Sequence, residues 1–199
     1  MHLFLELFTL GAFVATGVHL ARRRGPAGAW LYGALIWLGL VRESVVVAWR
    51  VLYELAPLTL ELGRVPVIAM VIWAFSITAA VAWAEETTAR GRRLHAGAVA
   101  PSLMLGAVLF MAVLPGFYEP FLERVGMARW EAGTRTTFGV PWIAVVGYAT
   151  LTAAFLLLWG PLMRIAGARR RALAMALGVG TLAAAHAWGL AVLKGWLGW

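Results

Sequence analysis

Long apolar runs alternate with short charged segments along this chain. Six of the runs are close to the roughly 20 residues that a helix needs to cross a bilayer. They cover residues 3–21, 27–52, 65–83, 96–114, 138–163 and 172–193. The pattern predicts an all-α fold class: a polytopic integral membrane protein with about six transmembrane helices in a single domain over residues 1–199. The first run carries its basic residues after the apolar stretch, so we interpret it as a retained helix rather than a cleaved signal peptide.

Basic residues cluster in every second connection between these runs. The clusters are Arg22, Arg23 and Arg24; Arg90, Arg92 and Arg93; and Arg164, Arg169, Arg170 and Arg171. Cytoplasmic connections of membrane proteins carry an excess of Arg and Lys. The alternation therefore predicts that the three clusters face the cytoplasm and that both termini lie outside.

The composition narrows the class of protein. Of the 199 residues, 62% are hydrophobic and 13% are charged, whereas soluble domains have about 45–50% apolar and about 25% charged residues. These values exclude a disordered chain, a basic nucleic-acid-binding domain and an ordinary soluble domain, so nucleic acid is not an expected partner. The sequence contains no Cys, which excludes disulfides, thiolate metal sites and Cys nucleophiles.

Two of the runs begin with related sequences. Residues 65–73 and 140–148 both have the pattern Val-Pro-x-Ile-Ala-x-Val-x-aromatic, and a Tyr-Glu pair precedes each, at 53–54 and 118–119. The similarity predicts that the second and third helices and the fourth and fifth are two parallel copies of one hairpin, related by an axis along the membrane normal. Each proline is expected at the first helical position, where its missing N–H has no intrahelical acceptor to lose. Chance similarity among common apolar residues is the alternative.

The second run contains charged residues at membrane depth. Arg42 lies roughly 22 Å along the helix from its start, at about 1.5 Å per residue. Glu43, Arg50 and Glu54 are spaced i, i+7 and i+11 and would share one helical face. A charge inside the bilayer costs about 2.5–3.5 kcal/mol, so this face must turn away from lipid. We favour a functional role for Arg42 and Glu43, whereas Arg50 and Glu54 fit an interfacial ion pair equally well.

The connection that follows residue 114 holds a further candidate acid. Glu119 follows Tyr118 and has a proline and two Phe residues nearby, an apolar setting that favours the protonated carboxyl. A solvated glutamate in an interfacial loop is the alternative. Trp130, later in the same connection, fits either a site residue or an interface anchor. We expect the acids of this connection and of the second helix to border one pocket in the outer half of the bundle.

Histidine and glycine patterns exclude several kinds of cofactor chemistry. His19 and His186 would differ in depth by roughly 15 Å, so they cannot ligate one haem. No His-x-x-x-His or His-x-x-His-His motif indicates a di-iron centre, and neither a glycine-rich phosphate loop nor a Gly-x-Ser-x-Gly motif occurs. His186 is interpreted as a polar contact between helices or a residue lining the site.

The second half of the chain resembles a known family. Residues 138–142, Phe-Gly-Val-Pro-Trp, and the Gly-Tyr pair at 147–148 resemble a Phe-Gly-Val-Pro-Leu run that reaches a Gly-Trp in the carotenoid biosynthesis membrane proteins of bacteria and archaea, of the bisanhydrobacterioruberin hydratase type. In that family an acid-Pro pair and a Trp precede the run. Here Glu119-Pro120 and Trp130 stand at those places, with Glu for the usual Asp.

The first half is similar to the same family. Glu43, Tyr53, the Val-Pro pair at 65–66 and Trp73 follow the family's order of a Glu, a Tyr-containing segment, a Gly-Val-Pro and a Trp. The resemblance covers residues 43–148, about half of the chain. Trp142 and Ala144-Val145 replace the Leu and the Asn-Phe pair of the family's second motif.

The resemblance implies addition of water to a terminal C=C bond of a long polyene, with no cofactor, in a bacterial or archaeal cytoplasmic membrane. A carboxylic acid would protonate the alkene, a carboxylate or Tyr would orient water, and aromatic faces would stabilise the cation. The predicted catalytic residues are Glu119, Glu43 and Glu54, and the predicted substrate-binding residues are Arg42, Arg50, Tyr53, Tyr118, Trp130, Trp142, Tyr148 and His186. No metal ligand is predicted. Expected partners are membrane lipid, a carotenoid or other polyisoprenoid, and a larger membrane complex if the chain is a subunit.

Two further functions fit the same sequence. A non-catalytic membrane subunit could bind a carotenoid or quinone, or pack against a larger complex, through the same aromatic helices. A small transporter would use the repeat and the intramembrane charges, but the sequence lacks clear helix breaks at the midplane. An enzyme requires at least two of the three glutamates at one cavity, whereas a binding subunit would leave them at separate interfaces.

The topology can be tested by labelling single cysteines introduced into this Cys-free chain. We expect a cysteine placed next to Arg92 to be protected from an impermeant thiol reagent in intact cells, because a basic connection stays in the cytoplasm. A cysteine near the C-terminus should be labelled in the same cells. Labelling of the cysteine next to Arg92 from outside would contradict the predicted orientation.

Overall fold

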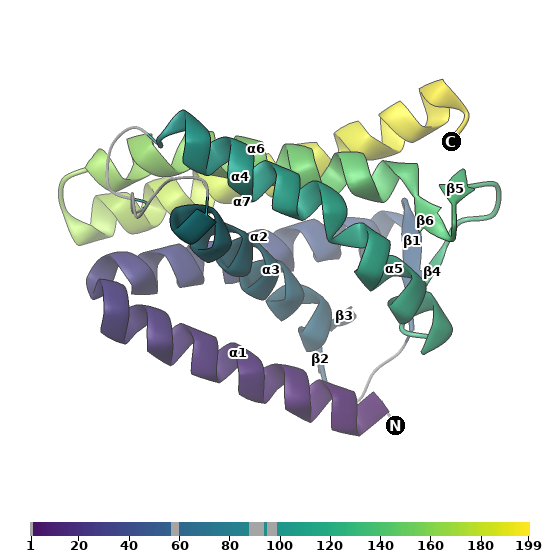
Figure 1. The fold of residues 1–199 in the computed structure, drawn as a ribbon, viewed down its shortest axis with the longest axis horizontal. Helices are drawn as coiled ribbons and strands as arrows, with labels where there is room; N and C mark the ends of the chain where they lie inside the picture. The colour runs from purple at the N-terminus through teal and green to yellow at the C-terminus, as the bar shows by residue number, and fades with distance from the viewer. Residues whose placement is uncertain (1, 57–59, 88–93, 95–98) are drawn as a thin grey trace.

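The computed structural model describes residues 2–56, 60–87, 94 and 99–199, and most of them are helical (Figure 1). The helices are α1 (His2–Arg24), α2 (Pro26–Trp49), α3 (Val67–Thr87), α4 (Pro101–Val113), α5 (Pro115–Arg124), α6 (Trp142–Arg164) and α7 (Ala168–Leu197). Five helical stretches in these ranges are long and apolar enough to cross a membrane: α2, α3, α4 together with α5, α6 and α7. The prediction of a helical chain suited to a membrane is confirmed. The six runs found in the sequence correspond to α1, α2, α3, α4, α6 and α7, although residues 96–98 of the fourth run lie outside the described residues.

The predicted second, third and fifth helices differ from the observed ones at one end. Helix α2 ends at Trp49, because Arg50 adopts the left-handed conformation with φ of 49° and its N–H bonds to the Val46 carbonyl. The Val-Pro pairs form strands β3 (Val65–Pro66) and β6 (Val140–Pro141) directly before α3 and α6. Each proline therefore precedes its helix by one residue instead of beginning it. Proline fits there because a short edge strand leaves its missing N–H without consequence.

Helix α5 occupies a segment that the sequence predicts as a connection. Pro115 and Gly116 have the composition of a loop, but Pro115 begins α5, and α4 is interrupted only at Leu114. Proline is accepted in the first turn of a helix, because the N–H that it lacks would have no acceptor there. Glu119 therefore projects from a helix, which fixes the direction of its side chain more firmly than a loop would.

Three short antiparallel strand pairs lie at one end of the bundle. Strand β1 (Tyr53–Leu55) pairs with β4 (Ala128–Trp130), β2 (Glu61–Leu62) with β3, and β5 (Thr136–Thr137) with β6. In the β1–β4 register Tyr53 is opposite Trp130 and Glu54 is opposite Arg129. The hydrophobic pattern predicts none of these strands, since each has only two or three residues. The β1–β4 pair joins two segments that are far apart in the sequence.

Helix α3 lies at the centre of the bundle, where α1, α2 and α4 pack against it. The core includes large, fully buried side chains such as Leu35, Phe155 and Trp159. Helices α2 and α3 approach each other closely at Gly39: a Cβ atom at this position would lie 2.3 Å from the Met70 carbonyl oxygen. The absence of a side chain at Gly39 therefore sets the spacing of the two helices that carry much of the site described below.

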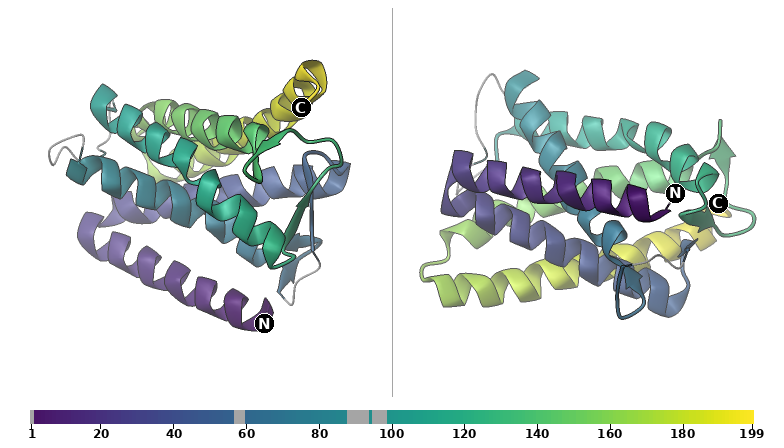
Figure 2. Two further views of the ribbon diagram at one scale, coloured as in Figure 1. Left: turned by 45° about the vertical axis from the view of Figure 1, so that its right-hand side comes forward. Right: turned by 90° about the horizontal axis from the view of Figure 1, so that it is seen from below.

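The connections α1–α2 and α6–α7 lie at one end of the molecule, and both termini lie at the other end with the strands (Figures 1 and 2). Two of the predicted basic clusters, around Arg23 and Arg170, belong to the first end. Arg90, Arg92 and Arg93 lie outside the described residues. The distribution agrees with a membrane protein whose two ends differ in charge.

The close approach at Gly39 predicts a local effect of added volume. Gly39→Ala should destabilise the protein by about 1–3 kcal/mol, because the new methyl group overlaps the Met70 backbone. Gly33→Ala, on the same helix, meets no atom within 4 Å and should change stability by less than about 1 kcal/mol, in the stabilising direction. SDS titration of the detergent-solubilised protein, followed by circular dichroism, measures both. Equal stability of the two variants would contradict this packing.

Candidate functional site

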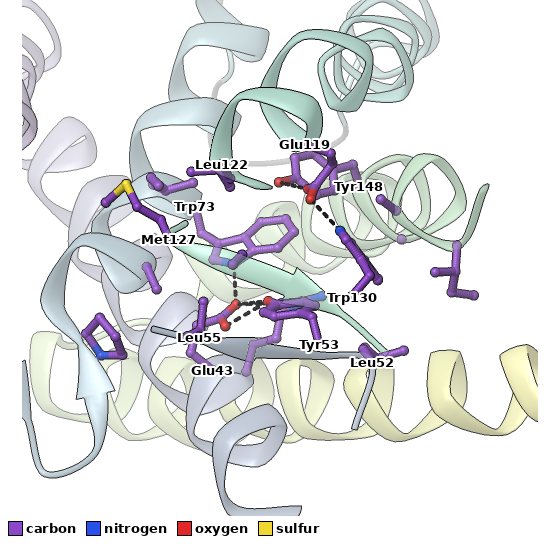
Figure 3. A pocket seen from close by; sticks show the side chains of 18 of the residues that line it. Glu43, Leu52, Tyr53, Leu55, Trp73, Glu119, Leu122, Met127, Trp130 and Tyr148 are labelled. Carbon is purple, nitrogen blue, oxygen red and sulfur yellow. Dashed lines mark hydrogen bonds and ion pairs between the residues drawn. The ribbon is translucent and has the colours of Figure 1, made fainter. Parts of the chain in front are cut away.

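A buried cavity of about 50 Å³ lies where the strands meet the helix bundle (Figure 3). A cavity of this size has room for at least one water molecule. Most of its lining is apolar, from α2, α3, α5, α6, β1 and β4. The polar and aromatic residues that line it are Arg42, Glu43, Tyr53, Trp73, Glu119, Trp130 and Tyr148. The cavity thus brings two carboxyl groups and one guanidinium group into an apolar interior.

Glu43 is 1% exposed, and its carboxylate accepts hydrogen bonds from residues of two helices and one strand. Trp73 Nε1 of α3 donates to Oε1 at 2.7 Å, and the Tyr53 hydroxyl of β1 donates at 2.9 Å to Oε1 and at 2.8 Å to Oε2. Arg42, the preceding residue, forms an ion pair with it. These donors replace water around the carboxylate, which is the condition for burying it.

Arg42 is 3% exposed and completes the first half of the site. Its Nη1 donates to the Tyr53 hydroxyl oxygen at 2.6 Å. Its guanidinium carbon lies 4.4 Å from the centre of the Trp73 ring and 5.7 Å from that of Tyr53. A cation over an aromatic face is stabilised by the electron density of the ring. The buried charge of Arg42 is therefore compensated by one carboxylate and two aromatic rings.

Glu119 is 5% exposed and lies on the other side of the cavity. Trp130 Nε1 of β4 donates to Oε2 at 2.9 Å, and the Tyr148 hydroxyl of α6 donates to Oε1 at 2.9 Å. Within the described ranges Glu119 forms no ion pair. Its carboxyl is thus held by neutral donors alone, in contrast to Glu43.

The two glutamates are held by corresponding partners. Each is hydrogen-bonded by an aromatic residue of a short strand, 10 residues later for Glu43 and 11 for Glu119. Each accepts another from an aromatic residue in the helix that follows a Val-Pro pair, 30 and 29 residues later. The strand residues Tyr53 and Trp130 contact each other with ring centres 5.0 Å apart, as do Trp73 and Tyr148 at 4.7 Å. Figure 3 shows the rings of Trp73 and Trp130 between the two carboxyl groups, with Tyr148 beside Glu119 and Tyr53 beside Glu43.

Tyr53 keeps its proton at neutral pH. Burial raises the pKa of its phenol well above the ordinary value of 10; the Arg42 guanidinium opposes the shift and the Glu43 carboxylate adds to it. The neutral hydroxyl can therefore accept from Arg42 and donate to Glu43 at the same time.

The structure brings six of the predicted site residues to this cavity and separates the others from it. Those at the cavity are Glu43, Glu119, Arg42, Tyr53, Trp130 and Tyr148. Arg50 and Glu54 line a separate groove. The helical spacing that placed Glu54 beside Glu43 does not apply, because α2 ends before Arg50. In strand β1, Tyr53 and Glu54 point to opposite faces. The Tyr-Glu pairs at 53–54 and 118–119 are also not equivalent, since one begins a strand and the other lies within a helix.

The three remaining predicted residues do not line the cavity. Tyr118 packs with Ile68 and Met127. The Trp142 side chain is 48% exposed and its Nε1 donates to Thr137. His186 Nε2 lies 3.0 Å from the Thr150 hydroxyl, in agreement with a polar contact between helices.

Trp73 is a site residue that the sequence interpretation does not include. Its indole donates to Glu43, and its ring lies under Arg42. The signal was present in the repeat: Trp73 and Tyr148 both stand at the aromatic position of the Val-Pro pattern, and only Tyr148 was assigned to the site.

Comparison of the chain with protein-family models, with curated proteins and with solved structures finds no match. In the part of the chain that the structure describes, no three His, Asp or Glu side chains are grouped as metal ligands. The main chemical feature of the candidate site is therefore a pair of buried carboxyl groups at an apolar cavity. Glu43 is paired with a cation, and Glu119 has no cation partner in the described ranges.

The buried ion pair predicts an asymmetric response to substitution. Arg42→Met should destabilise the protein by about 3–5 kcal/mol, because it leaves the Glu43 carboxylate buried without its cation. Arg42→Met combined with Glu43→Gln should be more stable than Arg42→Met alone, since no buried charge remains. Arg129→Met, at an exposed position of β4, is the control and should change stability by less than about 0.5 kcal/mol. SDS titration measures all three, and an additive loss in the double variant would contradict the pairing.

Proposed function

We propose that the protein is an integral membrane enzyme of six spanning helices that adds water to a terminal C=C bond of a long polyene, as in carotenoid biosynthesis. The proposal places it in a bacterial or archaeal cytoplasmic membrane with both termini outside. The observation that carries it is the pair of buried carboxyl groups, Glu43 and Glu119, at one apolar cavity. Acid–base chemistry on an apolar substrate requires carboxyl groups that transfer protons, and it requires an apolar cavity that holds the substrate against them.

We also propose that the two halves of the site arose by duplication of one helical hairpin. In this view Glu43 corresponds to Glu119, Tyr53 to Trp130, and Trp73 to Tyr148. The matching hydrogen bonds and the Val-Pro pairs before α3 and α6 support the correspondence. The antiparallel register of Tyr53 opposite Trp130 is also what two related strands would give on meeting across a two-fold axis.

The unequal surroundings of the two carboxyl groups suit two roles in hydration. Glu119, which has no cation partner in the described ranges, transfers its proton to the less substituted carbon of the double bond and leaves a tertiary cation on the more substituted carbon. Glu43, kept as a carboxylate by Arg42, accepts a proton from the water molecule that attacks this cation. A C–H and a C–O bond form, the π bond breaks, and no electron acceptor is needed. The ring of Tyr148, which lines the cavity, can stabilise the cation.

The size of the cavity suits the end of a long substrate. A volume of about 50 Å³ holds about two carbon atoms of a chain, and the lining has mainly apolar side chains such as Ile72, Leu122 and Ile143. The remainder of a polyene would lie along the helices in the bilayer. Substrate would therefore enter sideways from the lipid and present only its terminal double bond to the carboxyl groups.

The proposal is tested by expressing the chain in a bacterium that makes acyclic carotenoids and analysing the pigments by mass spectrometry. We expect a product heavier by one water molecule. Glu119→Gln should lower its yield by about 100-fold or more, since a general acid contributes about 10²–10⁴-fold to a rate. Glu123→Gln, at an exposed position of the same helix, should keep the full yield.

Other outcomes would contradict the proposed function. Full conversion by a folded Glu119→Gln variant would remove this residue from the mechanism. A purified protein that carries bound polyene, with no hydrated product from any substrate offered, would instead identify a non-catalytic carotenoid-binding subunit. Absorption spectra of the purified protein separate this result from a failure to bind.

A further inference from the structure

A second cavity lies beside the candidate site, at the end of the bundle that holds the strands. Its volume is about 340 Å³, and we call it the vestibule. It is formed by the end of α2, by β1 and by the β2–β3 hairpin. Its charged residues are Arg50, Glu54, Glu61 and Arg64, all of them exposed. The vestibule is therefore polar and open to solvent, whereas the cavity at Glu43 and Glu119 is mainly apolar and buried.

One strand separates the vestibule from the candidate site. Tyr53 and Leu55 of β1 line both cavities. Both side chains are half-buried, whereas Arg42 and Glu43 behind them are buried. The Tyr53 hydroxyl bonds to both carboxylate oxygens of Glu43, at 2.8 and 2.9 Å. Tyr53 is thus in contact with the vestibule on one side and with a carboxylate of the candidate site on the other.

We propose that the vestibule supplies water to Glu43 and that Tyr53 is the positioning residue between the two. This inference rests on the proposed hydration reaction and names the source of its second substrate. Water passes along the edge of the Tyr53 ring, and the Tyr53 hydroxyl fixes the Glu43 carboxylate in the orientation that receives the proton of that water.

The polarity of the two cavities supports separate routes for the polyene and for water. Hydration consumes one water molecule per turnover, and the hydrocarbon core of a bilayer supplies almost none. The substrate cavity has few polar groups with which to collect water, whereas the vestibule has four charged side chains that hold it. Two Arg and two Glu leave the vestibule without formal net charge, which suits a neutral molecule better than an ion. The polyene and the water would thus reach the carboxyl groups from different sides.

The backbone at this boundary is unusual. Arg50 and Leu52, on either side of Val51, adopt positive φ angles of 49° and 74°. Non-glycine residues avoid this region, and such conformations persist where the surrounding structure imposes them. Here they turn the chain sharply from α2 into β1, which brings Tyr53 back over Glu43.

The route is tested by the reactivity of a cysteine inside the substrate cavity. Ala144, 3% exposed, lines this cavity and not the vestibule. In lipid nanodiscs, Ala144→Cys should react slowly with a charged, membrane-impermeant thiosulfonate. Adding Tyr53→Ala should increase the rate at least about tenfold, because it removes the shared wall. Adding Leu122→Ala, which enlarges the same cavity away from the vestibule, should change it by less than about twofold.

A second variant tests the positioning role. Tyr53→Phe keeps the wall and removes the hydroxyl, so Ala144→Cys should react as slowly as it does when Tyr53 is unchanged. The same variant should lower kcat for hydration by at least about tenfold with little change in KM, since the hydroxyl acts on Glu43 and not on substrate binding. A purely structural role would lower thermal stability and leave kcat unchanged.

The outcomes separate this proposal from the proposed function. Equal reactivity of Ala144→Cys in the presence and in the absence of the Tyr53→Ala substitution overturns the vestibule route even if the protein is a hydratase. If Tyr53→Ala does not fold, Leu55→Ala removes the other shared wall residue and must give the same increase. If no variant and no wild-type protein hydrates a polyene, the proposed function fails, while the labelling rates still decide whether the two cavities communicate through Tyr53.

Discussion

The carboxylate of Glu43 lies inside a bundle of helices that are otherwise almost wholly apolar, and the arrangement around it depends on satisfying that charge. A charge at this depth costs about 2.5–3.5 kcal/mol on insertion scales, and more when it has no partner. Its partners are the adjacent Arg42, the indole of Trp73 and the hydroxyl of Tyr53. Because these come from a helix, a second helix and a strand, satisfying one carboxylate requires that three elements meet at one point.

The carboxyl group of Glu119 is buried without a cation partner in the described ranges. It has the same kinds of donor, an aromatic residue of a strand and one of a helix, but no ion pair in the described ranges. Two carboxyl groups with matched donors and unmatched charge are suited to opposite proton-transfer roles. The surroundings of the two carboxyl groups differ in charge because Arg42 precedes Glu43, whereas Tyr118 precedes Glu119. Similar donors and a cation at only one of the two carboxyl groups are the basis of the proposed acid and base.

The sequence predicts the long apolar helices, whereas α5 lies in a segment that it predicts as a connection. Apolar runs of membrane length identify helices well, since their signal extends over about twenty residues. The cost of placing charge in lipid predicts that Arg42 and Glu43 face the interior of the bundle, and both are buried there. The short strands were missed, because two or three residues carry no periodic signal. The predicted place of Glu54 is wrong for another reason. Helical spacing does not apply beyond Trp49, because Arg50 in a left-handed conformation ends the helix. Trp73 was overlooked because its role depends on a contact across the bundle.

The register in which β1 pairs with β4 determines which of their side chains line the cavity. Side chains alternate between the two faces of a strand, so a shift by one residue exchanges every inward residue for an outward one. Here the neighbours of Tyr53 and Trp130 in the ladder are Glu54 and Arg129. A deletion of one residue before β1 would thus put Glu54 in the place of Tyr53, and an insertion of one residue before β4 would put Arg129 in the place of Trp130. Either change exchanges one aromatic hydrogen-bond donor for a charged side chain at the wall of the cavity. The lengths of the segments that lead into β1 and β4 are therefore under tighter constraint than their individual residues.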